Sequence, residues 1–468
     1  MDSTIVSNTE EPCVVYPWEP CHDNEMQMKA SFEDNYLDYM SNLKIESSPS
    51  PNTLTTIACG IQHNVTRSLI KEFCESGASM VIFDFNGLSF EQSRKMVYEI
   101  RQGVFNYSLK KNNRVPYSMT LVLDLEGSCI TTGSIFHTTT TQRLIELSTN
   151  SHVYVTNDVE YKFKCTEDRI YVNSDIILRL KINDRIYLDY GKIELAVIRV
   201  DEDEVYCVIK RGEFLGSKKV VHVPGVPVGS TALTKLDEEK IRTGIQLKVD
   251  VILVPGVRNS VFFDSVRKFV GTERGRDISL YAKIDNTVGL ENMDDIIPGV
   301  DGVFLNRPNL SMEVGHDKIF LAQKIVLSKC NLSKPKIDPT QAISIGCVEV
   351  SFKCHAAAII VITTSGLSAR YIARYRPRCP VLAVVRHGKS ARKLSVWRNI
   401  IALQYIGPIE NVFKDIENRT RFAMDFGRRK GILHQRDLVL HMSYSKQSMG
   451  FANTMSVFYV SAGDFVSA

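Results

Sequence analysis

A lysine and a carboxylate lie two residues apart in the stretch YAKIDNTVG, residues 281–289. Apolar runs on either side of it, LKVDVILVPGV and PGVDGVFLNRP, predict short buried strands, and Lys283 lies near the end of a third. Because side chains alternate along a strand, Lys283 and Asp285 point to the same face. A cation beside an anion at the end of a strand suits the binding of a phosphate and a metal ion. It suits a structural ion pair equally well.

A second candidate site is the stretch VITTSGLS, residues 361–368, in which an apolar strand leads through a glycine-bearing turn into a helix. Backbone N–H groups and hydroxyls at the start of a helix can hold a phosphate. The same residues also form ordinary helix caps, so their spacing leaves both interpretations open. His355, His387 and His441 each stand alone and are more typical of packing or surface residues than of metal ligands.

The composition indicates a soluble globular protein with several domains, since 468 residues contain 44% hydrophobic and 24% charged residues. No apolar run approaches the ~18 residues of a membrane span. The N-terminus lacks the basic start and apolar core of a secretory signal. Eleven cysteines without a CxxC pair favour reduced thiols over a disulfide framework or a zinc site. We therefore expect a cytoplasmic protein with no membrane contact.

Charge is unevenly distributed around the net value of +4. Residues 1–50 contain ten acidic residues against two lysines, whereas residues 366–446 contain seventeen lysines and arginines against five acidic residues. A basic surplus can bind nucleic acid or small phosphorylated ligands, or can form a solvated face. Because no aromatic residues are interleaved and no nucleic-acid motif is present, we expect a solvated face first, phosphate binding second and no nucleic-acid partner.

The elements that must position these residues alternate between strands and helices. Six apolar runs bounded by turn residues predict strands: LTTIACGI, SMVIFDF, SMTLVLDL, VDVILVPGV, DISLYAKI and VDGVFLNR. Such alternation predicts a parallel sheet or a (β/α) barrel. Short alternating runs over residues 134–230 predict an inserted β-rich domain. Residues 1–50 provide an acidic tail and one helical stretch, FEDNYLDYMSNL, and residues 338–468 predict a further open α/β domain.

From about residue 30 to the C-terminus, the chain resembles the pyruvate kinase family. The stretches that carry the resemblance, in order, include AKIDNTVG, FLAQKIVLSKCN, VEVSFKCHAAAIIVITTSGLSARYIARYRPRCPVLAVVR and GFANTM. The resemblance implies the glycolytic transfer of phosphate from phosphoenolpyruvate to ADP with Mg²⁺ and K⁺, carried out by a homotetramer. It also implies a (β/α) barrel A domain, an inserted β-barrel B domain and a C-terminal domain with an effector pocket.

The barrel of this chain is shorter than that of the family. Its two parts, residues 51–133 and 231–337, supply six predicted strands, whereas a complete barrel has eight strand–helix units in about 250 residues. The chain passes directly from CNLSKPKI to DPTQAI, where the family has its seventh and eighth strands. We therefore predict a truncated (β/α) barrel with an inserted β-rich domain and a C-terminal open α/β domain.

At several of the catalytic and metal-binding positions that the resemblance implies, this chain has a different residue from the family. It makes Lys283 the catalytic lysine, Asp285 a shortened Mg²⁺ ligand and Asn309 the degraded position of a second Mg²⁺ ligand. The predicted K⁺ positions are Asp124, which matches the family, and Asp84 and Asn86, which are altered.

Further departures affect substrate binding. Ile82 stands where the family has an arginine for the substrate phosphate, Leu125 replaces a threonine and Thr131 replaces a later arginine. The threonine that helps to protonate the enolate falls in the missing segment. Because phosphoryl transfer depends on charge neutralisation, with single cationic groups contributing on the order of 10³ to 10⁵ in rate, these losses together predict very weak turnover or none.

The effector pocket has changed less. Its predicted phosphate-binding residues are Thr363, Ser365, Gly366 and Ser368, with Arg419 for a second phosphate. The closing loop SYSKQSMG has lost most of the family's glycines and its tryptophan, and Lys446 stands at an arginine position. A sugar-phosphate effector and a plain helix cap both remain open here.

The sequence therefore predicts a pyruvate kinase-family protein with lost or very weak catalysis, which acts through binding or assembly as a homo-oligomer or with other pyruvate kinase chains. One alternative is a working pyruvate kinase with an altered metal site, using Lys283, Asp285 and Asp124 on phosphoenolpyruvate and ADP or ATP. Another is a phosphate-metabolite-binding assembly partner of an active pyruvate kinase, built on the C-terminal domain.

Overall fold

The computed structural model describes most of the chain, in these segments: residues 55–61, 65–110, 115–127, 130–135, 144–224, 233–332, 338–408, 411–444 and 452–461. Contacts divide the chain into two compact units. One comprises residues 1–82, 94–121 and 335–468, and the other comprises residues 83–93 and 122–334. The predicted helix FEDNYLDYMSNL, the segment KPKI and most of the loop SYSKQSMG lie outside the described residues.

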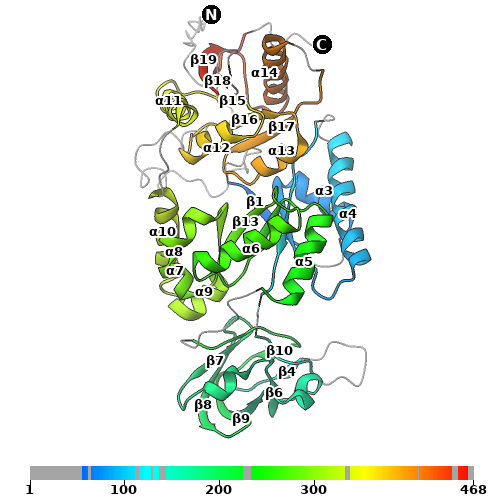
Figure 1. Ribbon diagram of the computed structural model, residues 1–468, viewed down its shortest axis with the longest axis vertical. Helices are drawn as coiled ribbons and strands as arrows, with labels where there is room; N and C mark the ends of the chain where they lie inside the picture. Colours follow the sequence, from blue (N-terminus) through cyan, green and yellow to red (C-terminus); the bar gives the residue numbers. More distant parts are fainter. Residues whose placement is uncertain are drawn as a thin grey trace, which may run out of the picture. The chain divides into compact units, whose positions relative to one another are not determined.

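Six strands form the barrel sheet in the order β1-β2-β3-β12-β13-β14. Figure 1 labels β1 and β13 of this sheet. The pairs β1–β2, β3–β12, β12–β13 and β13–β14 are parallel. Each strand coincides with one of the six apolar runs, with β2 beginning one residue before its run, which confirms the predicted strands. Their bounds are β1 (Ile57–Gly60), β2 (Ala78–Phe83), β3 (Thr120–Asp124), β12 (Val251–Val254), β13 (Ser279–Ile284) and β14 (Gly302–Leu305).

The helices that accompany these strands begin at polar capping residues. The side chains of Thr234, Asn259 and Asn286 each accept a hydrogen bond from a backbone N–H three residues on, which satisfies a donor that the first helical turn leaves unpaired. The helices are α3 (Arg67–Glu75), α4 (Phe90–Lys110), α5 (Lys235–Gln246), α6 (Ser260–Thr272), α7 (Thr287–Glu291), α8 (Met293–Ile296), α9 (Arg307–Val314) and α10 (Ile319–Leu332).

The barrel is truncated after its sixth strand, as predicted. Helix α10 ends at Leu332 and the next helix begins at Pro339, which leaves far too few residues for two strand–helix units of ~30 residues each. The inner strand β12 is buried along its whole length, whereas β14 is half-buried throughout and β1 is largely exposed. The two edges of an open sheet are thus more accessible to water than its centre.

The inserted β-rich domain has its own apolar core. Its main sheet has the strand order β11-β7-β8-β9-β5-β6, and β4 pairs with β10 (Figure 1). Inward-facing residues such as Val153, Val155, Leu195 and Val205 alternate with more exposed ones along the strands. The strands are β4 (Ile145–Glu146), β5 (His152–Thr156), β6 (Arg169–Tyr171), β7 (Arg185–Leu188), β8 (Ile193–Val200), β9 (Glu204–Arg211), β10 (Phe214–Leu215) and β11 (Val221–His222).

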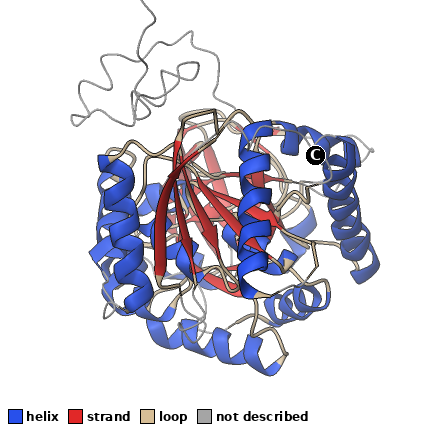
Figure 2. Ribbon diagram, turned by 90° about the horizontal axis from the view of Figure 1, so that it is seen from above, coloured by secondary structure: helices blue, strands red, loops and turns tan. Residues whose placement is uncertain are grey.

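The C-terminal domain is a five-stranded sheet with helices on both faces. The strand order is β17-β16-β15-β18-β19. Of the described strand pairs in this sheet, β18–β19 at the edge is antiparallel and the other three are parallel. Figure 2 shows helices in blue around the strands in red. The elements are α11 (Pro339–Lys353), β15 (Ala358–Ile362), α12 (Leu367–Arg374), β16 (Val381–Val385), α13 (Gly388–Leu394), β17 (Ile400–Gln404), α14 (Val412–Arg429), β18 (Leu438–Ser443) and β19 (Thr454–Tyr459).

Strand β15 supplies both cores of this domain because its side chains alternate between the two faces. Ile359 and Val361 join the core that includes residues of α11, α12 and α13, and Ile360 and Ile362 join the core that includes residues of α14. Among the described residues, no helix combines the length and the apolar character that crossing a bilayer requires.

We predict that Ile360→Ala lowers the free energy of unfolding of this domain by about 2–5 kcal/mol, because the fully buried side chain leaves a cavity. The matched variant Ile406→Ala, at a side chain that is 73% exposed, should change it by less than about 0.5 kcal/mol. Urea unfolding followed by circular dichroism measures both. Equal losses would contradict the described packing of β15.

Candidate functional site

Lys283 forms an ion pair at the carboxyl edge of the barrel sheet. It lies on β13, is only 8% exposed, and donates a hydrogen bond from Nζ to Oδ1 of Asp124 at 2.7 Å. Asp124 ends β3, two strands away in the sheet. Parallel strands place their carboxyl ends at one edge, which is why residues so far apart in sequence meet there. Asp124 thus neutralises the ammonium of Lys283, so an anionic substrate would have to compete with this carboxylate for it.

Asp285 follows β13 and is held by neutral donors. Its carboxylate accepts hydrogen bonds from the backbone N–H of Gly256 at 3.2 Å and from Nδ2 of Asn286 at 2.9 Å. Burial raises the pKa of the Asp285 carboxyl above its ordinary value, against the opposing influence of these hydrogen bonds and of Lys283. The nearby Glu313 acts in the same direction as burial. The Asp285 carboxyl therefore releases its proton less readily than the carboxyl of a solvated aspartate.

Helix α9 brings Asn309 and Glu313 to this region. Oε2 of Glu313 accepts hydrogen bonds from the backbone N–H and the hydroxyl of Thr287 at 2.5 and 2.7 Å, so this carboxylate is engaged at the start of α7. Asn309 lies in the first turn of α9, and its buried Oδ1 has no hydrogen-bond donor among the described residues. The amide oxygen is neutral, so α9 adds no free negative charge at the position predicted for a metal ligand.

A second buried lysine, Lys240 of α5, lies among the predicted K⁺ positions. Its ammonium donates a hydrogen bond to Oδ1 of Asn86 and lies 3.6 Å from Oε2 of Glu126. Lys240 is only 4% exposed. Oδ1 of Asp84 accepts the backbone N–H of Asn86 at 2.8 Å, which fixes the turn after β2. The chain thus places a cation of its own at these oxygens.

The predicted effector loop binds its own backbone. The hydroxyl of Thr363 accepts the N–H of Gly366 at 3.1 Å, and the hydroxyl of Ser365 accepts the N–H of Leu367 at 3.4 Å. Gly366 adopts a left-handed conformation with φ of 86°, which favours glycine over other residues. Ser365 is exposed whereas Ser368 is buried. These hydrogen bonds close the turn before α12, and phosphate binding to it stays a prediction.

Arg419 is held between strand ends. It is 2% exposed, and its guanidinium donates to the backbone carbonyls of Thr363, at 2.7 Å, and Val384. Desolvation lowers the pKa of Arg419, while the nearby Asp415, whose Oδ2 lies 3.4 Å from Nη1, opposes that change. These contacts tie α14 to β15 and β16. A role for Arg419 at a second phosphate stays a prediction.

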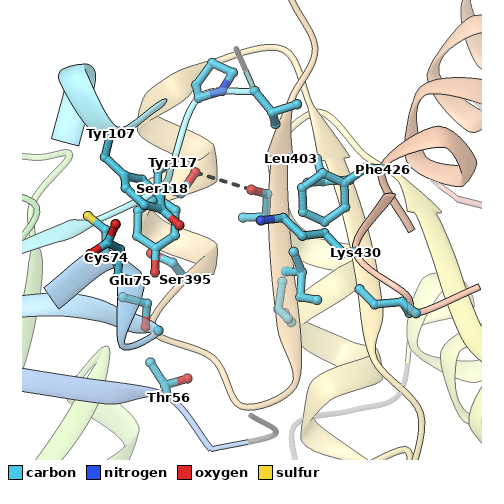
Figure 3. Close-up of a pocket in the computed structure, with 18 of the residues that line it drawn as sticks. Thr56, Cys74, Glu75, Tyr107, Tyr117, Ser118, Ser395, Leu403, Phe426 and Lys430 are labelled. Carbon is cyan, nitrogen blue, oxygen red and sulfur yellow. Dashed lines mark hydrogen bonds between the residues drawn. The ribbon is translucent and has the colours of Figure 1, made fainter. Parts of the chain in front are cut away.

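A cavity of about 640 Å³ lies elsewhere in the first unit (Figure 3). Its wall includes the end of α3, α4, the residues before β3, β17 and α14. The hydroxyl of Tyr117 donates to the carbonyl of Ala78 at 2.9 Å, and that of Ser118 donates to the carbonyl of Ala402 at 3.3 Å. Glu75 and Lys430 add one charge of each sign. Nothing in the sequence pattern predicts this cavity, because its lining comes from segments far apart in the chain.

Two family models match the chain in succession. Residues 52–345 match the model described as "Pyruvate kinase, barrel domain", and residues 341–458 match "Pyruvate kinase, alpha/beta domain". The chain belongs to the pyruvate kinase family. The predicted resemblance is therefore confirmed, together with a fold of a barrel domain and an α/β C-terminal domain.

The chain is similar to pyruvate kinases over most of its length. Pyruvate kinase PKLR of Homo sapiens is 27% identical, covering 93% of this chain and 90% of that protein. The pyruvate kinases of Candida albicans and Trypanoplasma borreli are 25% and 22% identical, covering 90% and 91% of this chain and 98% and 99% of those proteins. The three alignments run over 524, 509 and 508 positions, more than the 468 residues of this chain. Each therefore contains positions that this chain lacks.

Members of the pyruvate kinase family use Mg²⁺, but the donor set here does not fit it. Mg²⁺ prefers hard anionic oxygens in near-octahedral geometry. The predicted positions supply one carboxylate, that of Asp285, which already accepts hydrogen bonds from Gly256 and Asn286, and the neutral amide of Asn309. Among the described residues, no three His, Cys, Asp or Glu side chains are grouped as a metal site would need.

K⁺ does not fit the predicted positions either. The oxygens of Asn86 and Asp124 are each taken by a lysine ammonium, from Lys240 and Lys283 respectively. A further cation among them would meet two like charges. The sequence pattern missed Lys240, since the polar stretch LDEEKIRTG looks like an exposed helix face. The signal that could have found it is the spacing of Asp237 and Lys240, which places both on one side of α5.

We predict that Gly289→Ala destabilises the site, because a Cβ at this position would lie 2.3 Å from the carbonyl oxygen of Val257. We expect a loss of about 1–3 kcal/mol in the free energy of unfolding. The matched variant Gly271→Ala, in α6 with open space around the added Cβ, should gain about 0.5–1 kcal/mol. Thermal unfolding compares the two. A neutral Gly289→Ala would contradict the described approach of α7 to Val257.

Proposed function

We propose that this chain is a degenerate pyruvate kinase with little or no phosphoryl transfer, which acts through binding and assembly. The observation that carries the proposal is the hydrogen bond of 2.7 Å between Lys283 and Asp124. A catalytic lysine must offer its charge to the transferred phosphoryl group, which is stabilised chiefly by electrostatics. In this chain the same ammonium serves a structural carboxylate.

The replaced residues support the same proposal. Ile82 provides no guanidinium for a substrate phosphate, and Asn309 removes a formal charge from the predicted Mg²⁺ position. The missing strand–helix units remove a further part of the substrate site that the resemblance implies. No single loss is decisive, but they all act on the same charge-stabilised transition state, so their effects on the rate combine.

A working pyruvate kinase with an altered metal site is the alternative. It would use Lys283, Asp285 and Asp124 on phosphoenolpyruvate and ADP, with Mg²⁺ or Mn²⁺ and K⁺. This alternative requires Asp124 to release Lys283 on substrate binding. A direct assay separates the two proposals.

We expect purified protein to convert phosphoenolpyruvate and ADP to pyruvate at less than about a hundredth of the rate of an ordinary pyruvate kinase, because its charge-stabilising groups are lost or paired. An assay coupled to lactate dehydrogenase, with Mg²⁺ or Mn²⁺ and K⁺, measures this rate. Lys283→Met distinguishes activity of this chain from a contaminating enzyme. A rate above that limit that disappears in Lys283→Met supports the working enzyme and overturns the proposal.

Exposed apolar side chains on α10 support the assembly part of the proposal. Phe320, Leu321, Ile325 and Leu327 are 59%, 55%, 42% and 47% exposed on this helix, which follows β14 and α9 in the chain. Several large apolar side chains exposed on one helix are typical of a contact with another chain. The sequence preserves long stretches of the family in the C-terminal domain, so we propose assembly with itself or with a full-length pyruvate kinase.

We expect this chain, co-expressed with a full-length pyruvate kinase, to co-purify with it and to elute well above the 52.8 kDa of one chain. Phe320→Glu combined with Leu321→Glu should weaken that complex, because both charges would be buried in it. Val261→Glu, at a position 75% exposed on α6, is the matched control. A well-folded monomer that ignores the partner would refute assembly.

A further inference from the structure

Lys240 is unusual in its burial and in its partners. Its side chain is 5% exposed, and its ammonium contacts the carbonyl oxygen of the Asn86 amide and the carboxylate of Glu126. A lysine is seldom buried to this degree unless it is paired. The ammonium has three N–H donors and carries one positive charge, and these two oxygens are its partners. An alkali cation would likewise present one positive charge to oxygen ligands.

Helix α5 fixes the position of this ammonium. Thr234 caps the helix by accepting the N–H of Asp237 at 3.0 Å, and its hydroxyl donates to Oδ2 of Asp237 at 2.6 Å. Oδ1 of Asp237 accepts the N–H of Gly127 at 3.3 Å, which joins the first turn of α5 to the segment after β3. Lys240 lies three residues later on the same side of the helix, so its side chain is delivered to this segment.

Gly127 allows the close approach. It has a positive φ of 71°, and a Cβ added there would lie 2.7 Å from Cγ of Pro255. The segment after β3 therefore has one conformation, with Glu126 directed to Lys240 and Asp124 to Lys283. Each of these two ammoniums is thus paired with a carboxylate at this edge of the sheet.

From these contacts we infer that Lys240 is a built-in monovalent cation that takes the place of K⁺ at Asn86, one of the three predicted K⁺ positions. The inference concerns the ionic requirement of the fold and holds whether or not the chain transfers phosphate. A bound K⁺ would add a third positive charge beside the ammoniums of Lys240 and Lys283 and would compete for the oxygen of Asn86. The ammonium is covalently attached to the chain, so it loses no translational entropy on contacting Asn86. It therefore contacts Asn86 at any salt concentration.

The test compares thermal unfolding in KCl and in tetramethylammonium chloride at equal ionic strength, with full-length protein. We expect the melting temperature of the unaltered chain to be the same in both salts. Lys240→Met leaves the oxygens of Asn86 and Glu126 without a cation, so it should unfold at least about 3 °C lower in tetramethylammonium and regain part of that loss in KCl. Lys235→Met, at an exposed lysine of the same helix, should behave like the unaltered chain in both salts.

Thallium NMR provides a measurement that does not depend on the variant. Tl⁺ substitutes for K⁺ in oxygen sites, and the unaltered chain should show no saturable bound signal, whereas Lys240→Met should show one that K⁺ displaces. Saturable Tl⁺ binding by the unaltered chain would overturn the inference. So would a folded Lys240→Met that is equally stable in both salts. If Lys240→Met does not fold, the behaviour of the unaltered chain towards Tl⁺ and K⁺ decides the question.

Discussion

A buried ammonium group must have oxygen partners, because leaving a charge uncompensated away from water costs several kcal/mol. This constraint governs the carboxyl edge of the barrel sheet. Lys283 takes the carboxylate of Asp124, and Lys240 takes the oxygens of Asn86 and Glu126. The turns after β2 and β3 are arranged around these two lysines. The helix that carries Lys240 is anchored at the same place through Asp237 and Gly127.

The same constraint shapes the C-terminal domain. The guanidinium of Arg419 is almost wholly buried, and it is satisfied by the carbonyls of Thr363 and Val384 and by Asp415. Arg386 adds a second cation to the same carboxylate. Buried cations thus hold the strand ends of the barrel sheet in one unit. In the other unit, a buried cation holds α14 to strand ends of the C-terminal domain. A ligand that recruited any of these cations would have to replace the structural contact it took away.

Much of the fold could be predicted from the sequence, because apolar runs between turn residues are a local signal. All six barrel strands and the open α/β character of residues 338–468 follow from it. The candidate site could be predicted only in its residues and not in its contacts. Alternation along β13 puts Lys283 beside Asp285, yet the ion pair is with Asp124, 159 residues away. Pairing across a sheet depends on strand order, which no local pattern contains. The burial of Lys240 could not be predicted for the same reason, because the segment after β3 that contacts it is far away in the sequence.

The retention of Lys283 is the feature of the sequence that most suggests catalysis, and the structure supplies a different reason for it. In an active enzyme the lysine persists because the transition state needs its charge. Here, removing Lys283 would leave Asp124 without its ion-pair partner and would disturb the balance of charge with Lys240 and Glu126. The side chain of Lys283 is 11% exposed and that of Asp124 is 32% exposed, so Lys283 depends on this pair more than Asp124 does. A lysine recruited in this way is kept by the stability of the fold. Its presence in the chain is therefore no evidence of turnover by itself, because the ion pair with Asp124 accounts for it equally well.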